Sequence, residues 1–294
     1  MERFKNVGTT MKSIDLARLS LASLVLAIAA PQQTLADSRQ SAPVSPPPSY
    51  ADLADLADAA PLVAKAQVRK VTPIEPARAR NVRPGHGRFL VEARTQEVLF
   101  GRVSLGEALK YLVDLPLDAK GKPANLKKRS VLLFARPVPA RPGELQLVAP
   151  DAQLVWDAPL DGRMRALIGE LTAPGAAQRI NGVREAIHVP GNLTGEGETQ
   201  LFLATADGEP AAITVRRSPG QPPAWGVSFS EVVGESGAVP QRDTLAWYRL
   251  ACFLPATLPS GVNLSGSQAD RLQAGTDYRF VMAQLGPCPR IRAQ

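Results

Sequence analysis

Histidine and cysteine are scarce in this chain of 294 residues, which has two of each, and aromatic residues make up only 5% of it. The histidines, His86 and His188, lie far apart, and no HExxH pair is present, so no zinc site is recognisable. The sequence also lacks a GxSxG elbow, a GxGxxG fingerprint, a phosphate-binding loop and a calcium loop. We therefore assign no catalytic, cofactor-binding or metal-binding residue from the sequence.

An enzymatic interpretation stays open in two places. A triad that uses His86 or His188 requires no particular spacing, because the members of such triads come from distant positions. Glu196 and Glu198 could also work as an acid–base pair, although turns beside strands commonly carry such residues. We favour the structural alternative for all four: His86 in an exposed loop, His188 in a strand, and the two glutamates beside a turn.

Long apolar runs are absent after the first 36 residues, and those residues have the pattern of a secretory signal peptide. Basic residues precede the uncharged run 19–30, and Thr34-Leu35-Ala36 supplies small residues where a signal peptidase cleaves. The run is short for a membrane span. We expect cleavage after Ala36; cleavage after Ala29, a start at Met11 and an uncleaved anchor are the alternatives.

The two cysteines, Cys252 and Cys288, fit the same compartment. An even number of cysteines in an oxidising environment favours a disulfide between them. A reactive thiol is the alternative, but the chain has no CxxC motif and Cys252 has apolar neighbours. Together with a composition rich in Ala, Arg and Pro, which is typical of bacteria, this predicts a soluble periplasmic protein with no transmembrane segment in its mature part.

Positive charge is unevenly distributed along the chain. The net charge is +7, and Lys and Arg are concentrated in residues 62–147, whereas residues 37–61 and 148–294 are mildly acidic. This asymmetry predicts two domains with different surfaces. A basic surface in the cell envelope could meet lipopolysaccharide phosphates, anionic lipid or other polyanions. Nucleic acid is not expected as a partner of an exported protein without an aromatic recognition motif.

A basic loop between two predicted strands is the clearest candidate for contact with an anion. Such a loop is commonly a solvated turn that also prevents edge pairing, and contact with an anion or a lipid headgroup is the functional alternative. Its residues are Lys120, Lys122, Lys127, Lys128 and Arg129.

The large aromatic residues of the second half, Trp225, Trp247 and Tyr248, are expected in the core. A pocket between the two halves of the chain is the alternative for them.

The first half has the pattern of a small OB-like barrel over residues 50–175. Residues 37–49 are rich in Pro and Ser and predict a linker, which a helix over 50–60 with Ser49 as its N-cap follows. Alternation of apolar and polar residues then predicts a series of strands. The expected strands are 62–71, 89–100, 111–117, 130–138, 144–148 and 152–156.

The second half, residues 176–294, is predicted to be a second β-rich domain. We expect Asp161 to cap a helix that ends at Leu171, and a domain boundary near 173–182. The further expected elements are a hairpin of 200–205 and 212–216 around Asp207-Gly208, a strand at 225–229, a helix over 244–253 capped by Asp243, a short helix near 268–272, and a last strand over 278–285.

Residues 51–157 resemble small secreted OB-like modules, of which netrin-like domains are the best known. The similarity rests on an acidic helix followed by Leu62-Val63-Ala64-Lys65-Ala66-Gln67-Val68 and further strands. The cysteines that normally fix the start of netrin-like domains are missing here. The resemblance implies an OB-like barrel and, by analogy, a protease-inhibitor-like module. The whole chain is also similar to exported proteins of alphaproteobacteria, which implies no activity.

These observations favour a non-enzymatic binding or interaction module of the cell envelope. The expected partner is an envelope protein or an anionic ligand, and no cofactor is indicated. A hydrolase whose site is not visible in the sequence and a protease-inhibitor-like module are the alternatives.

Overall fold

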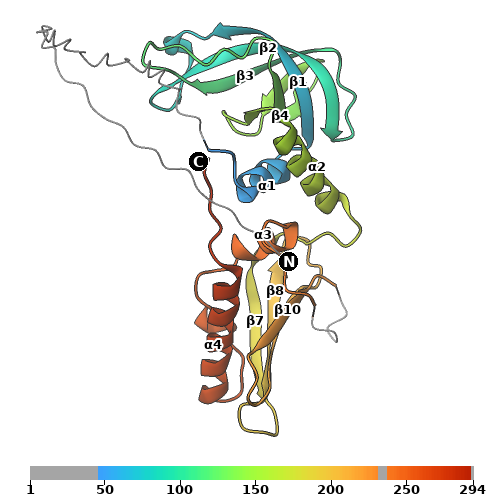
Figure 1. The fold of residues 1–294 in the computed structure, drawn as a ribbon, viewed down its shortest axis with the longest axis vertical. Coiled ribbons are helices and arrows are strands. Elements are labelled where there is room, and N and C mark those ends of the chain that lie inside the picture. Colours follow the sequence, from blue (N-terminus) through green and yellow to red (C-terminus); the bar gives the residue numbers. More distant parts are fainter. Residues whose placement is uncertain (1–45, 231–236, 293–294) are drawn as a thin grey trace, which may run out of the picture. The chain divides into compact units, whose positions relative to one another are not determined.

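Residues 46–230 and 237–292 are the part of the chain that the structure, a computed structural model, describes. The predicted signal peptide, its cleavage site at Ala36 and most of the predicted linker lie outside the described residues. From Pro46 on, the chain forms one compact unit that contains two β-sheets (Figure 1). The fold is mainly β, as the sequence predicted.

The first sheet closes into a five-stranded barrel, which confirms the predicted class of fold. The strand order β1-β2-β3-β5-β4 returns to β1 through the pairing of β1 with β4, and β6 adds to the outer side of β4. All pairs are antiparallel except β3 with β5. The strands are β1 (Leu62–Pro73), β2 (His86–Phe100), β3 (Ala108–Pro116), β4 (Ser130–Pro137), β5 (Glu144–Leu147) and β6 (Gln153–Val155).

Alternation along the strands fills the barrel interior. In β3, Leu109, Tyr111 and Val113 are buried, whereas Leu112 between them is half exposed. In β4, residues 131–135 are all buried, because helix α1 (Tyr50–Ala59) packs against this strand from outside. This explains why the β4 segment is an uninterrupted apolar run rather than an alternating one.

Helix α1 (Tyr50–Ala59) begins at the predicted N-cap. The Ser49 hydroxyl accepts a hydrogen bond from the Asp52 backbone N–H, and the Asp52 carboxylate accepts one from the Ser49 N–H, which completes a capping box. Leu53 and Leu56 are buried, and the helix packs against β4 of the barrel and against two later helices.

Helix α2 (Ala158–Thr172) starts earlier than predicted, because Asp157 and not Asp161 is its N-cap. The Asp157 carboxylate accepts a hydrogen bond from the Leu160 N–H, and a proline lies in the first turn, where it needs no hydrogen-bond partner. Asp161 lies inside the helix, and its carboxylate accepts hydrogen bonds from the Trp156 indole and from Arg165.

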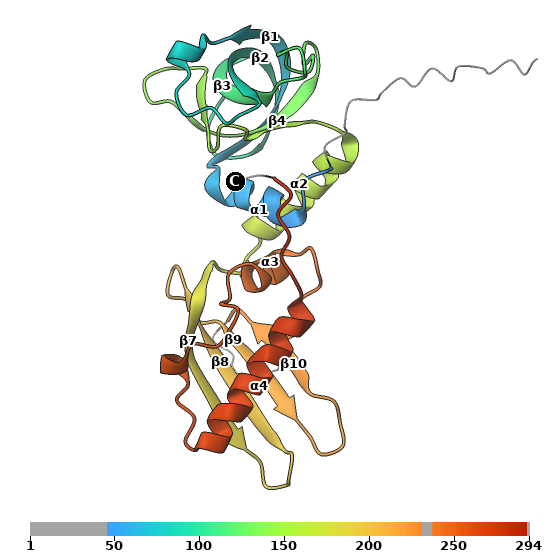
Figure 2. The ribbon, with the colours of Figure 1, turned by 90° about the vertical axis from the view of Figure 1, so that its left-hand side faces the viewer.

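The second sheet has the order β10-β9-β8-β7 and is antiparallel throughout. The predicted hairpin around Asp207-Gly208 joins β8 and β9. Helix α4 (Gln268–Leu285) lies along one face of this sheet (Figure 2). The strands are β7 (Ile180–Pro190), β8 (Gly197–Thr205), β9 (Ala212–Arg217) and β10 (Ala224–Ser228).

The prediction of a last strand over 278–285 was wrong, because these residues belong to helix α4 (Gln268–Leu285). A capping box of Ser267 and Asp270 starts this helix. Its buried residues include Ala274, Tyr278, Val281 and Leu285, at spacings of three and four that fit a helix.

Helix α3 (Leu245–Ala251) is shorter than predicted, and Thr244 rather than Asp243 caps it. Asp243 has a positive φ of 59°, which is not the conformation of a right-handed helix. It therefore lies before the helix and turns the chain toward it. The disulfide Cys252–Cys288 joins the end of this helix to the segment after α4, with 5.3 Å between the two Cα atoms. This confirms the predicted pairing.

Short 3-10 turns occur at Pro76–Arg78 and Ser260–Val262. Within the described ranges, no helix has the length and apolar character needed to cross a membrane.

Candidate functional site

Among the residues that the structure describes, no serine forms a hydrogen bond with the ring of either histidine. His86 is the first residue of β2 rather than a loop residue, because it pairs with Pro116, and its Nδ1 lies 3.1 Å from the Pro84 carbonyl. His188 lies in β7 as predicted and is buried. Ser265 accepts a hydrogen bond from the His188 backbone N–H, not from its ring.

His188 instead belongs to a buried polar network that ties the second sheet to α4. Its Nδ1 is 2.9 Å from the Thr199 hydroxyl, which donates to the Asp277 carboxylate at 2.5 Å. Arg217 pairs with the other oxygen of the same carboxylate, to which Gln273 also donates. A fully buried carboxylate with this many donors is a satisfied structural group.

Glu196 and Glu198 do not form an acid–base pair either. Glu196 accepts hydrogen bonds from the backbone N–H groups of Asn192 and Leu193 within a turn. Burial acts to raise the pKa of Glu198, but hydrogen bonds from Gln200 and Arg216 outweigh it and lower that pKa. A carboxylate held ionised in this way is poorly suited to donate a proton.

The aromatic residues of the second half are core residues, as expected. Trp225, Trp247 and Tyr248 are all buried. The Trp247 indole donates to the Leu285 carbonyl, and the Tyr248 hydroxyl donates to Asp55 of α1 at 2.6 Å. Burial is the main reason that the pKa of Tyr248 is raised.

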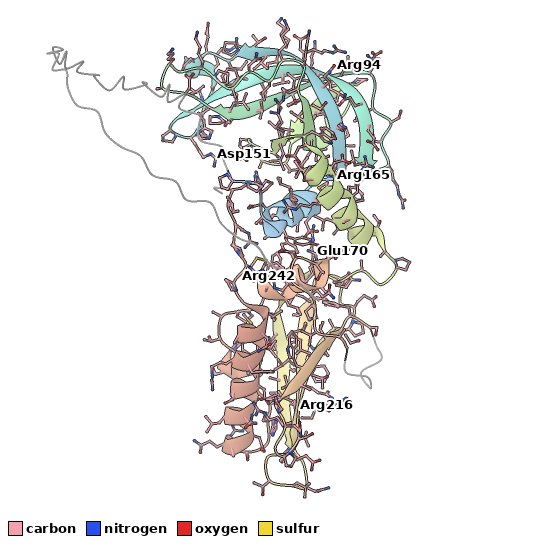
Figure 3. All side chains as sticks on the ribbon, in the orientation of Figure 1. Arg94, Asp151, Arg165, Glu170, Arg216 and Arg242 are labelled. Carbon is pink, nitrogen blue, oxygen red and sulfur yellow. A yellow bond between two sulfur atoms is a disulfide. The ribbon has the colours of Figure 1, made fainter. Side chains whose placement is uncertain are left out.

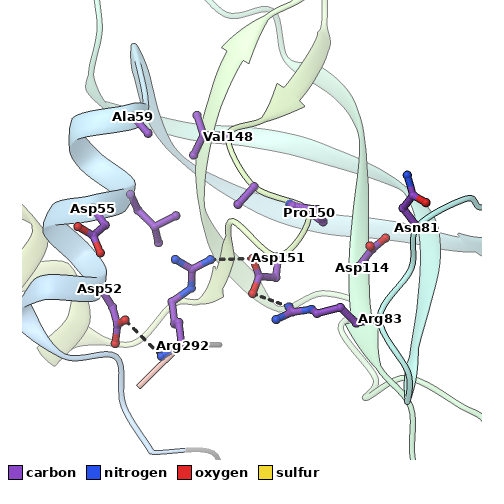
Figure 4. A pocket seen from close by; sticks show the side chains of 12 residues that line it. Asp52, Asp55, Ala59, Asn81, Arg83, Asp114, Val148, Pro150, Asp151 and Arg292 are labelled. Atoms are coloured by element: carbon purple, nitrogen blue, oxygen red, sulfur yellow. Dashed lines mark hydrogen bonds and ion pairs between the residues drawn. The ribbon is translucent and has the colours of Figure 1, made fainter. Parts of the chain in front are cut away.

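A cavity of about 450 Å³ lies beside α1 and residues 148–151 (Figure 4). Arg292 and Arg83 donate to opposite oxygens of Asp151, at 2.7 and 2.8 Å. The Asp52 carboxylate accepts hydrogen bonds from the backbone N–H groups of Ile291 and Arg292. Four aspartates and two arginines line this cavity, but Asp55 and Asp114 are also paired with Arg290 and Arg88, which lie outside the lining, so these carboxylates already have cationic partners.

The acidic repeat of α1 explains why several ion pairs lie around this cavity. Asp52, Asp55 and Asp58 are spaced by three residues, which places their side chains along one side of the helix. Asp55 forms two hydrogen bonds with Arg290, and Asp58 forms two with the buried Arg249. The sequence shows this repeat, but its charges gave no indication of partners that lie about two hundred residues away.

A larger cavity of about 760 Å³, here called the basic groove, lies on the barrel between β1, β2 and the loop before β4. Its floor is apolar and includes Val71, Phe89, Leu117 and Leu126. A volume in this range is typical of ligand-binding clefts. The lining residues are Arg69, Lys70, Val71, Pro73, Ile74, Pro76, Gly87, Arg88, Phe89, Leu117 and residues 121–127.

Five cationic side chains and no carboxylate belong to the residues that line the basic groove. Arg88 forms a bidentate pair with Asp114, at 2.7 and 2.8 Å, and Lys70 lies 3.6 Å from Glu92. The other three, Arg69, Lys122 and Lys127, form no ion pair with any residue in the described ranges.

The predicted anion-contact residues divide into two groups. Lys122 and Lys127 line the basic groove, whereas Lys120, Lys128 and Arg129 do not. Asp118 accepts hydrogen bonds from the backbone N–H groups of Lys120 and Lys122, which closes a tight turn with Lys120 at its tip.

At the other end of the loop, Lys128 has a positive φ of 65°, and its N–H donates to the Val68 carbonyl. This reverses the chain and takes Lys128 and Arg129 away from the groove. The sequence did not indicate Arg69, Lys70 or Arg88 as lining residues, because they come from other strands and only strand pairing brings them to the loop.

A third cavity, of about 810 Å³, lies over β3 and β5 and has mixed charge. Lys110 and Glu144 contribute one charge of each sign, and Arg88 and Asp114 there are already paired with each other. The basic groove is therefore the cavity whose charge most clearly selects one kind of ligand. No protein-family model matches this chain, and a search of curated proteins finds no similar sequence.

Proposed function

We propose that this protein is an exported, non-enzymatic binding protein of the cell envelope, and that its basic groove binds an anionic ligand with an apolar part. The observation that carries the proposal is the combination of five cations, no lining carboxylate and an apolar floor in one cavity. An uncharged apolar ligand would form no ion pair with the unpaired cations, and a simple anion would leave the apolar floor exposed to water.

Charge and apolar contact together supply enough free energy for specific binding. A hydrogen bond to a charged group contributes roughly 1.5–3 kcal/mol, and buried apolar surface contributes roughly 25 cal/mol per Å². Lys122 and Lys127 can supply two such contacts, and a ligand that covers the partly exposed Val71, Ile74 and Leu117 adds apolar burial, while the freedom lost on association offsets part of this sum.

Two features support export. The first is the leader sequence, whose apolar run and small residues before Asp37 fit a signal peptide. The second is the Cys252–Cys288 disulfide, which persists in oxidising compartments and is rare in the cytosol. In the envelope, lipid phosphates and acidic chains are the available anions.

Titration calorimetry of the chain from Asp37 onward tests the function with two anionic probes. One is dodecyl phosphate, below its micellar concentration, and the other is a blocked peptide of alternating glutamate and valine. Dodecyl maltoside is the uncharged control. We expect at least one anionic probe to bind, with an affinity that falls as salt rises because the contacts are partly exposed.

A matched pair of variants places this binding in the groove. Lys122→Gln with Lys127→Gln removes two lining charges, and we expect it to weaken binding about tenfold or more. Lys120→Gln with Arg129→Gln removes two charges from the same loop outside the groove and should leave the affinity within about twofold. Equal losses in both variants, or binding of neither anionic probe, would contradict the proposal.

A further inference from the structure

One edge of strand β1 is left open beside the basic groove. On one side, β1 pairs with β2 as far as Pro73. On the other side its pairing with β4 covers only residues 62–67, and backbone hydrogen bonds of Val68 with Lys128 and Arg129 are the last ones. Residues 69–73 therefore have a strand neighbour on one side only within the described part of the chain.

The register shows which backbone groups point to this open side. The Ile74 N–H donates to the Arg88 carbonyl, and Thr72 lies opposite Leu90 in the same register. Hydrogen-bonded and non-hydrogen-bonded pairs alternate in an antiparallel ladder. The N–H and C=O of Thr72 therefore face β2, and those of Val71 face away from it.

Val71 also lines the basic groove, so its outward N–H and C=O groups lie beside this groove. Arg69 and Lys70 precede it on the same strand, and residues 121–127 line the groove from the loop before β4. An added strand would lie about 4.8 Å from β1. Its side chains would then alternate between the apolar floor and the cations.

From this arrangement we infer that the ligand of the basic groove is an extended, acidic polypeptide segment that pairs with the open edge of β1. The inference rests on the function proposed above and names its class of ligand. The backbone of the added strand exchanges hydrogen bonds with Val71, and its carboxylates pair with Arg69, Lys122 and Lys127.

Charge also disfavours a second copy of this chain as the occupant. An open edge is a template for pairing with any strand, including the same edge of another molecule. Here residues 69–73 contain no carboxylate, so an identical edge offers no partner to the cations beside the groove, whereas an acidic strand does. Pro73 has no N–H to donate, which further limits the edge to a short segment. An acidic strand meets no charge repulsion and pairs with the same short segment.

The test uses the alternating glutamate–valine peptide in three forms, with the protein unchanged. One form is unmodified, one is N-methylated on the valine amides, and one is N-methylated on the glutamate amides. Only one of these two sets of amides can face β1, because strand amides alternate in direction. We expect one methylated form to lose about tenfold or more in affinity and the other to stay within about twofold.

Hydrogen exchange of the Val71 amide gives a second readout. The unmodified peptide should slow its exchange by about tenfold or more, because the amide becomes hydrogen-bonded. Vesicles of phosphatidylglycerol should leave it unchanged, since a lipid phosphate has no repeating backbone to pair with the strand.

The outcomes separate this inference from the proposed function. If dodecyl phosphate binds in the groove while the peptide does not, the function stands and the inference is overturned. If the peptide binds but both methylated forms bind equally well and Val71 is not protected, strand addition is overturned as well. If neither probe binds, both proposals fail.

Discussion

At the scale of single residues, loss of one partner from a buried ion pair destabilises the fold more than loss of one partner from an exposed pair. Arg249 is almost fully buried and forms two hydrogen bonds with Asp58 of α1. Arg94, labelled in Figure 3, pairs with Glu107 on the surface at 2.7 Å, and both side chains are more than half exposed. Solvent therefore screens the exposed Arg94–Glu107 pair much more than the buried Arg249–Asp58 pair.

The first prediction compares these two pairs. Asp58→Ala leaves the buried guanidinium of Arg249 without its carboxylate, and we expect it to lower the free energy of unfolding by about 3 kcal/mol. Glu107→Ala should change it by less than about 1 kcal/mol. Urea unfolding followed by circular dichroism measures both. Similar losses in the two variants would show that the Asp58–Arg249 pair has no special role.

Asp161 gives a prediction about pH. Its hydrogen bond with Arg165 is the main reason that its pKa is lowered, and the Trp156 indole adds to this. Because the folded pKa lies below the unfolded one, ionised Asp161 stabilises the fold above the usual aspartate range, and this stabilisation is lost as pH falls through the folded pKa.

We therefore expect Asp161→Asn to destabilise the protein at pH 7 and to cost less at acid pH. Urea unfolding at pH 7 and near pH 3 measures the difference between wild type and variant. Asp207→Asn, in the β8–β9 turn, is the control. A difference for Asp161→Asn that stays the same at both pH values would contradict the assigned cause.

At the scale of elements, α4 shows where sequence patterns mislead. Residues 278–285 contain aromatic and β-branched side chains that favour a strand, yet they form the second half of an 18-residue helix. Two signals for the helix were present: Ser267 and Asp270 at capping-box spacing, and apolar residues three and four apart. The residue types of 278–285 favour a strand locally, but the helical spacing extends over the longer segment 268–285 and determines the structure.

The cap of α4 can be tested directly. Ser267→Ala removes the hydroxyl that accepts from the Asp270 N–H, and we expect a loss of about 1 kcal/mol in the free energy of unfolding. Ser267→Thr, which keeps a hydroxyl that accepts from the Asp270 N–H and donates to its carboxylate, should restore most of it. An alanine variant as stable as wild type would show that the start of α4 does not depend on this cap.

At the scale of the whole molecule, local sequence patterns predict the helices and strands better than the contacts between segments that are distant in the sequence. The barrel strands and the β8–β9 hairpin follow from alternation and turn residues, and the disulfide follows from an even cysteine count. The basic groove could be predicted only in part. Lys122 and Lys127 lie in the loop that the sequence indicates, but Arg69 and Arg88 reach it through strand pairing, which no local pattern encodes.

The disulfide gives a prediction at this scale. Its cysteines are 36 residues apart, and closing a loop of that length restricts the unfolded chain by about 4 kcal/mol in the chain-entropy model. We expect Cys252→Ser with Cys288→Ser to lower the free energy of unfolding by about 2–4 kcal/mol. Reduction of the wild-type protein with dithiothreitol should give a similar loss. No change in either experiment would show that the bond does not stabilise the fold.

The carboxylates of α1 also set an order of assembly. Asp52 receives its last hydrogen bonds from Ile291 and Arg292, and the first of these residues comes 239 positions later in the chain. A ribosome makes this helix well before it makes residues 290–292. Until that segment is available, Asp52 lacks the Ile291 and Arg292 N–H groups and Asp55 lacks Arg290, so this side of α1 reaches its final hydrogen bonding only late in folding.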